Sequence, residues 1–101
     1  MASQAPSKPS AGDRRDLNKT QARLEKQVAR AEAEIAEFET KIKTRDLELA
    51  DPALYKNEST KWGALQIEYD GWEKDLARLT ARWETLSAEL EEVKQKLTAY
   101  A

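Results

Sequence analysis

Residues 62–100 read WGALQIEYDGWEKDLARLTARWETLSAELEEVKQKLTAY. Bulky apolar side chains recur in this stretch at alternating intervals of three and four residues, without a break. Such spacing is the a/d seam of a coiled coil, and it continues here for more than five heptads. A single helix cannot bury a seam of this length, so the segment must lie against another helix. The seam residues are Trp62, Leu65, Tyr69, Trp72, Leu76, Leu79, Trp83, Leu86, Leu90, Val93, Leu97 and Tyr100.

The composition limits the chain to one small, mostly helical domain. Of its 101 residues 36% are charged, and Gly and Pro are scarce, which favours long helices over a sheet with many turns. Cys and His are both absent, so thiolate chemistry and the commonest general acid/base and metal ligand are missing. Glycine-rich phosphate loops are missing too. The sequence therefore predicts no enzyme, no catalytic residue, no metal site and no cofactor.

Charge and hydropathy indicate the cellular compartment of the protein and the classes of partner that it binds. No apolar run approaches the roughly 20 residues that a membrane span needs. The first residues, MASQAPSKPSAGD, lack the apolar core of a secretory signal. We therefore expect a cytoplasmic protein with no membrane partner. The net charge of -2 gives no global reason to bind nucleic acid, so any such binding must be local.

The chain is predicted to consist of a tail and a helical hairpin. Residues 1–13 hold two of the three prolines and read as a flexible linker or tail. Residues 14–101 form the hairpin, whose first helix runs over about 14–50 with Asp13 as its N-cap. Pro52 ends that helix at or before Asp51.

The tip of the hairpin spans residues 51–58. Asp51 followed by Pro52 is a favourable N-cap and first helical residue, so one helical turn is expected within the tip. The second helix runs over about 59–100, with Asn57 or Ser59 as its cap.

The first helix carries a weaker seam, and it is interrupted at Gln21 and Arg45. Two helices of similar length joined by a short connection are antiparallel neighbours. Together these features predict an all-α fold, an antiparallel two-helix coiled-coil hairpin. The residues of the first seam are Leu17, Leu24, Val28, Ala31, Ile35, Phe38, Ile42 and Leu49.

Two registers of the hairpin fit the seams. When paired residue numbers sum to about 114, the small Ala31 faces the large Trp83, and Arg45 lies beside Tyr69, on which its guanidinium can stack. In that register Ile35 meets Leu79, Phe38 meets Leu76 and Ile42 meets Trp72, with Glu34 near Arg82 and Lys41 near Asp75. A register one heptad shorter, in which paired residue numbers sum to 107, pairs Lys41 with Glu68. The sequence leaves this second register as an alternative. We prefer 114.

Three pieces of the sequence together resemble a known family. They are DPALYK at 51–56, ARWETL at 81–86, and the heptad-rich first helix that leads into the former. With them, residues 14–95 resemble the C-terminal coiled-coil domain of ABC-F ATPases, the Uup type in particular. In that family a charged linker leaves the second ATP-binding cassette, and a helical hairpin with a D-P-x-x-Y-like tip follows. The cassettes themselves are absent, since the sequence has no G-x-x-x-x-G-K-[ST].

The resemblance implies a non-catalytic module that binds nucleic acid. It implies double-stranded DNA as the partner for the Uup type, or ribosomal RNA for a parent protein that acts at the ribosome. The ATP-binding cassettes of the parent chain would be its covalent partners. The sequence leaves open whether the chain is a domain of a larger ATPase or a stand-alone relative.

A basic segment at the start of the first helix is the candidate nucleic-acid interface. Five of its residues step by three or four and so lie along one face of a helix, which can follow a phosphate backbone. Cations at a helix N-terminus oppose the macrodipole, which invites a functional reason for them. The alternative is an internally paired face, because Glu84, Glu89, Glu91 and Glu92 lie at the facing end of the second helix. The segment comprises Arg14 and the basic ridge, Arg15, Lys19, Arg23, Lys26 and Arg30.

The tip offers a second candidate contact, made of Tyr55, Lys56 and Lys61. Tyr55 could stack on a base or sugar while Lys56 holds a phosphate. The alternative is that Leu54 and Tyr55 fold back over the end of the seam, above Trp62.

Two other groups of residues are interpreted as structural. Trp62, Trp72 and Trp83 could stack on single strands, but all occupy a/d positions, which favours packing in the seam. An acidic run in the first helix points to several sides and lacks loop geometry, which favours a solvated face over a cation site. It consists of Glu32, Glu34, Glu37 and Glu39.

We therefore weigh two functions for a hairpin that is expected to be a monomer with at most weak self-association. The first is a nucleic-acid-binding C-terminal module of an ABC-F-type ATPase. The second is a structural or protein-interaction coiled coil that does not bind nucleic acid.

Overall fold

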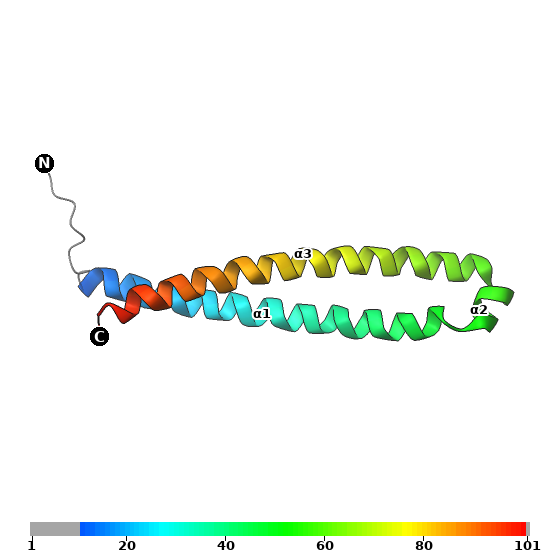
Figure 1. The fold of residues 1–101 in the computed structure, drawn as a ribbon, viewed down its shortest axis with the longest axis horizontal. Coiled ribbons are helices and arrows are strands. Elements are labelled where there is room, and N and C mark those ends of the chain that lie inside the picture. Colours follow the sequence, from blue (N-terminus) through cyan, green and yellow to red (C-terminus); the bar gives the residue numbers. More distant parts are fainter. Residues whose placement is uncertain (1–10, 101) are drawn as a thin grey trace, which may run out of the picture. The chain divides into compact units, whose positions relative to one another are not determined.

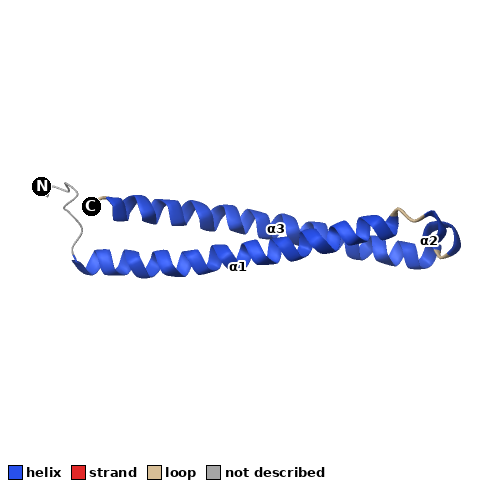
Figure 2. Cartoon of the chain, turned by 90° about the horizontal axis from the view of Figure 1, so that it is seen from below, coloured by secondary structure: helices blue, strands red, loops and turns tan. Residues whose placement is uncertain are grey.

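The computed structural model describes residues 11–100, and these residues form three helices. They are α1 (Ala11–Leu49), α2 (Pro52–Asn57) and α3 (Ser59–Thr98). Within this described range the chain contains no strand, and only short loops separate the helices (Figure 2). The predicted all-α class is confirmed. The predicted tail lies outside the described residues up to position 10, whereas residues 11–13 belong to α1.

The chain divides into two compact units, and α1 and α3 contribute to both. Of the described residues, the first unit comprises 11–29 with 84–100, and the second comprises Arg30–Trp83. Within each unit the two long helices lie side by side and run in opposite directions (Figure 1). The predicted antiparallel two-helix coiled-coil hairpin is therefore confirmed. No described helix is long and apolar enough to cross a membrane.

Contacts within each unit correspond to the register that sums to about 114. In the first unit the Arg14 guanidinium lies over the Tyr100 ring, 5.6 Å from its centre. In the second unit the Trp83 indole Nε1 donates a hydrogen bond to Glu32, at 3.1 Å. The competing register would place Lys41 beside Glu68, but Lys41 lies over the Trp72 ring instead.

The seam residues form the core of each unit, as their spacing dictates. In the first unit Leu24 is 2% exposed and packs with the buried Leu86 and Val93. In the second unit Ala31 is 4% exposed, while the bulkier Trp83 is half-buried. Further half-buried side chains surround the first core, namely Leu17, Val28, Leu90 and Leu97.

The tip forms the helical turn that the sequence predicts. Asp51 caps α2 by accepting a hydrogen bond from the Ala53 amide at 2.9 Å, and Pro52 is the first helical residue. The Trp62 indole Nε1 donates to the Leu49 carbonyl at 3.0 Å, which ties the start of α3 to the end of α1. Figure 1 shows α2 between these two helix ends.

The caps of the long helices differ from those predicted. Asp13 is not the N-cap of α1, because the helix begins at Ala11 and Asp13 lies inside its first turn. Its carboxylate still interacts favourably with the positive end of the helix dipole. Asn57 ends α2 and Ser59 already belongs to α3. Glu58 separates the two helices, and its carbonyl accepts the first α3 hydrogen bond from the Trp62 amide at 2.9 Å.

Candidate nucleic-acid interface and neighbouring sites

The basic ridge lies on the outer face of α1. Relative to the seam residues Leu17 and Leu24, its members occupy heptad positions b, c and f, which point away from α3. All five side chains are exposed. Four of them belong to the first unit, where none forms an ion pair with another residue of the described range 11–100. These four are Arg15, Lys19, Arg23 and Lys26.

The two remaining basic residues of the segment make internal contacts. Arg30 belongs to the second unit and pairs with Glu34 through its Nε at 3.3 Å, with 85% of the Arg30 side chain exposed. An exposed i,i+4 pair of this kind contributes little stability. Arg14 occupies a seam position and covers Tyr100. Burial and the Asp13 carboxylate raise the pKa of Tyr100, and the Arg14 cation opposes them.

The acidic residues of α3 do not form the pairs that would neutralise the ridge. Glu84, Glu91 and Glu92 occupy outer heptad positions of α3, on the side turned away from α1. Glu92 pairs with Lys96 within α3 at 3.7 Å. In the part of the chain that the structure describes, no ion pair joins the ridge to α3. The first unit therefore presents basic and acidic charges on opposite outer faces.

Tyr55 at the tip adopts the arrangement in which it folds back against Trp62. Tyr55 packs edge-on against Trp62, with ring centres 5.2 Å apart, yet 58% of Tyr55 remains exposed. Lys56 lies in the last turn of α2 and is exposed. Lys61 is exposed beside a hollow of about 400 Å³ that Glu48, Asp51 and Glu58 also line. The carboxylates of this hollow make the tip a less basic surface than the ridge.

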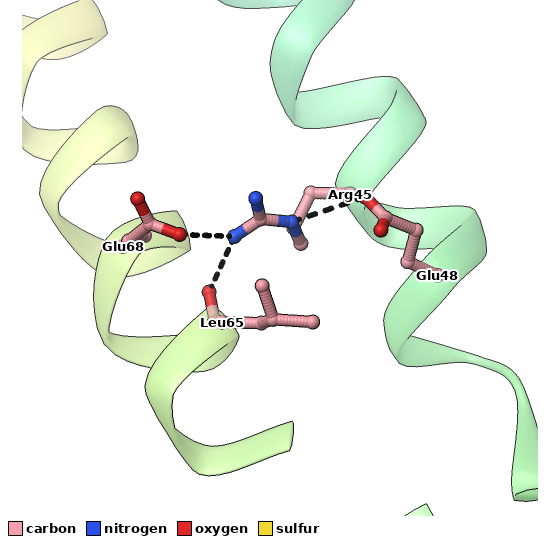
Figure 3. A network of polar contacts seen from close by, with 4 residues as sticks. All are labelled: Arg45, Glu48, Leu65 and Glu68. Carbon is pink, nitrogen blue, oxygen red and sulfur yellow. Dashed lines mark hydrogen bonds and ion pairs between the residues drawn. The ribbon is translucent and has the colours of Figure 1, made fainter. Parts of the chain in front are cut away.

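Arg45 interrupts the first seam and is held by a polar network (Figure 3). Its Nη1 donates to the Leu65 carbonyl at 2.9 Å and to Glu68 at 3.3 Å, while its Nε donates to Glu48 at 3.2 Å. Its guanidinium lies over the Trp72 ring, 4.4 Å from the centre. The predicted stacking on Tyr69 is wrong, because helical side chains lean toward the helix N-terminus and Arg45 therefore reaches the level of Trp72.

The predicted cross-helix charge pairs differ from the observed ones. Glu34 pairs with Arg30 within α1, and Asp75 pairs with Arg78 within α3 at 3.1 Å. Lys41 lies over Phe38 and Trp72.

Two members of the acidic run line a groove that the run alone does not predict. Glu32 and Glu39 are seven residues apart, so they share one edge of the helix pair, and they line a groove of about 370 Å³ with Ile35, Thr80 and Trp83. Their heptad spacing was the available signal. Taken as one run, the four glutamates point to several sides of the helix; sorted by heptad position, Glu32 and Glu39 fall on the same edge.

Comparison with known proteins identifies the family. The sequence matches the ABC transporter C-terminal domain over residues 8–88, which is most of the chain. The chain belongs to this family. The ABC transporter C-terminal domain is a module of an ABC ATPase and is not itself a catalytic cassette. Searches of curated proteins and of solved structures found no match.

Proposed function

We propose that this ABC transporter C-terminal domain is a nucleic-acid-binding module that contacts the phosphate backbone through the basic ridge. The observation that carries the proposal is the set of four exposed ridge cations that have no ion-pair partner within residues 11–100. Unpaired cations on one helix face are free to replace the counterions of a nucleic acid. Arg30 would join them by exchanging its weak contact with Glu34.

The dimensions of the ridge suit a duplex. Arg15 and Lys26 are separated by about 16 Å along the helix axis, at 1.5 Å per residue. A duplex carries about one negative charge per 1.7 Å of its axis, so several phosphates lie within that length. Contacts of this type carry no base preference, and double-stranded DNA and a ribosomal RNA helix are both candidate ligands. Lys56 and Lys61 at the tip are a separate candidate contact.

In the parent ATPase such a module would hold or orient the ATP-binding cassettes on the nucleic acid. The module itself would contribute binding and no catalytic group.

A titration with fluorescently labelled duplex DNA and with a ribosomal RNA helix tests the proposal. The ridge variant replaces Arg15, Lys19 and Arg23 by Glu. The control variant replaces Lys43, Lys74 and Lys94 by Glu, which makes the same change in net charge at exposed sites elsewhere. We expect fluorescence anisotropy to show binding by the wild type and the control variant, and none by the ridge variant. Equal loss in both variants would contradict a local site.

A protein-interaction role is the second candidate, and exposed apolar side chains favour it. Leu47 is 73% exposed and Ile67 is 74% exposed, each at an outer position of its helix in the second unit. If neither nucleic acid binds at low salt, these residues become the first surface to test for a protein partner.

A further inference from the structure

The two edges of the second unit differ in charge. The edge that includes Lys41 mixes cations and carboxylates, and Lys41 lies over Trp72, as the seam residue Arg45 does. On the opposite edge, the heptad positions that flank the seam carry no Lys or Arg between residues 30 and 83. The charged residues there are all acidic, and we call them the acidic edge: Glu32, Glu39 and Asp46 of α1 with Glu73 of α3.

The carboxylates of the acidic edge affect the pKa of Tyr69. A hydrogen bond with the Asp46 carboxylate, burial, and the charges of Asp46 and Glu73 together raise the pKa of Tyr69 to about 12. The charges of Asp46 and Glu73 disfavour a further negative charge at this edge and attract a cation, whereas burial disfavours a charge of either sign.

One groove on this edge has the shape and the chemistry to hold a cationic side chain. It measures about 370 Å³ and is lined by the half-buried Ile35, Thr80 and Trp83 and by two exposed residues, Glu32 and Glu39, which we call its rim. The Trp83 Nε1 donates to Glu32 at 3.1 Å, which fixes the indole beside a carboxylate. A guanidinium is attracted both to an aromatic ring and to carboxylates, and its apolar stem suits an apolar wall.

The molecule contains a completed example of this arrangement at Trp72. There the Arg45 guanidinium lies 4.4 Å from the ring centre. It also bonds to Glu48 and Glu68, as Figure 3 shows. At Trp83 the carboxylates are present, but within residues 11–100 no Lys or Arg lies over the ring. We propose that the acidic edge is a docking surface for a basic protein segment, one arginine of which inserts between Glu32 and Glu39 against Trp83.

A short peptide of glycine and serine with two arginines provides the probe, and the Trp83 indole N–H signal in nitrogen-15 NMR provides the readout. This signal is assigned by its absence in Trp83→Phe. The matched peptide with citrulline in place of arginine keeps the shape and removes the charge. We expect the arginine peptide to shift the Trp83 signal in a saturable manner and the citrulline peptide to leave it unchanged.

Two double variants test the location. E32Q with E39Q removes both rim charges but keeps an acceptor for the Trp83 N–H. E84Q with E91Q makes the same change in charge at two exposed glutamates that are also seven residues apart. We expect the first variant to weaken peptide binding about tenfold and the second to change it by less than about twofold. Circular dichroism checks that both variants keep their helices.

Several outcomes would overturn the proposal. They are the absence of any Trp83 shift, equal binding of the citrulline peptide, and equal weakening by both double variants. A Trp83 shift that grows with protein concentration in the absence of peptide would assign the groove to a second copy of the chain instead.

Discussion

At the scale of single residues, the polar side chain of Arg45 in the seam specifies the register of the two helices. Arg45 is 9% exposed, and its guanidinium satisfies a backbone carbonyl of α3, two carboxylates and the face of Trp72. A buried polar residue in a coiled-coil seam favours the one register in which its partners are available. A shift of one heptad would move Leu65 and Glu68 away from Arg45, so this residue disfavours the shorter register.

Replacing Arg45 by Met should therefore destabilise the hairpin although it adds an apolar residue to the seam. The variant loses hydrogen bonds to two carboxylates, and we expect its free energy of unfolding to fall by about 1–2 kcal/mol. This loss is smaller than that for a fully buried ion pair, because the two carboxylates are half-exposed. Lys43→Met, at an exposed position of the same helix, should change it by less than about 0.5 kcal/mol. Urea denaturation followed by circular dichroism measures both, and equal stabilities of the two variants would contradict the role given to Arg45.

Tyr69 should make the stability of the hairpin sensitive to alkali. Its folded pKa is about 12, raised chiefly by the hydrogen bond with Asp46, whereas an unfolded tyrosine titrates near 10. The folded state therefore holds the phenolic proton more tightly, and this contribution is complete below pH 10 and is lost as the pH rises toward 12. Tyr69→Phe should show a smaller loss of stability across that window. Identical pH profiles for the wild type and Tyr69→Phe would show that the raised pKa is absent.

At the scale of the helices, the sequence predicted the elements well and the side-chain partners less well. The uninterrupted seam from Trp62 to Tyr100 required a long α3, and Asp51 with Pro52 required a helical turn at the tip. The preferred register sets the Arg45 backbone opposite Tyr69, but the Arg45 guanidinium lies over Trp72, so the predicted stacking partner is wrong. A register pairs Cα positions, whereas long side chains lean by about a turn toward the helix N-terminus.

The groove at Trp83 was missed for a related reason. A run of glutamates in sequence is divided in space among several faces of a helix. Only the positions of Glu32 and Glu39 relative to the seam show that these two carboxylates share an edge with Trp83.

Two glycines of α3 occupy positions at which alanine is expected to stabilise the hairpin. Gly63 and Gly71 have helical neighbours on both sides, and neither has a positive φ. A Cβ atom added to either would meet no atom within 4 Å beyond its chain neighbours and the adjacent backbone of its own helix. Gly63→Ala and Gly71→Ala should each raise the free energy of unfolding by about 0.5–1 kcal/mol, because alanine restricts the unfolded chain and favours the helix. Urea denaturation of the single and double variants tests this, and a destabilised variant would show that the space around these positions is occupied in solution.

At the scale of the whole molecule, charge distribution matters more than net charge. The chain carries -2 overall, yet the outer face of α1 in the first unit is basic and the acidic edge in the second unit has no cation at its seam-flanking positions. A negative net charge weakens the attraction of any nucleic acid, so we expect affinities in the range of nonspecific binding, about 10⁻⁴–10⁻⁶ M at physiological salt. The family membership places this surface on a module of an ABC ATPase.

The salt dependence of nucleic-acid binding tests the central claim most directly. The logarithm of the binding constant for duplex DNA is measured against the logarithm of the salt concentration, for the wild type and for Lys19→Ala, Arg23→Ala and the control Lys74→Ala. Each lost phosphate contact lowers the magnitude of the slope by about 0.9. The proposed interface predicts this reduction for Lys19→Ala and Arg23→Ala and an unchanged slope for Lys74→Ala. Equal slopes for all four proteins, or no measurable binding at low salt, would contradict a nucleic-acid interface on the basic ridge.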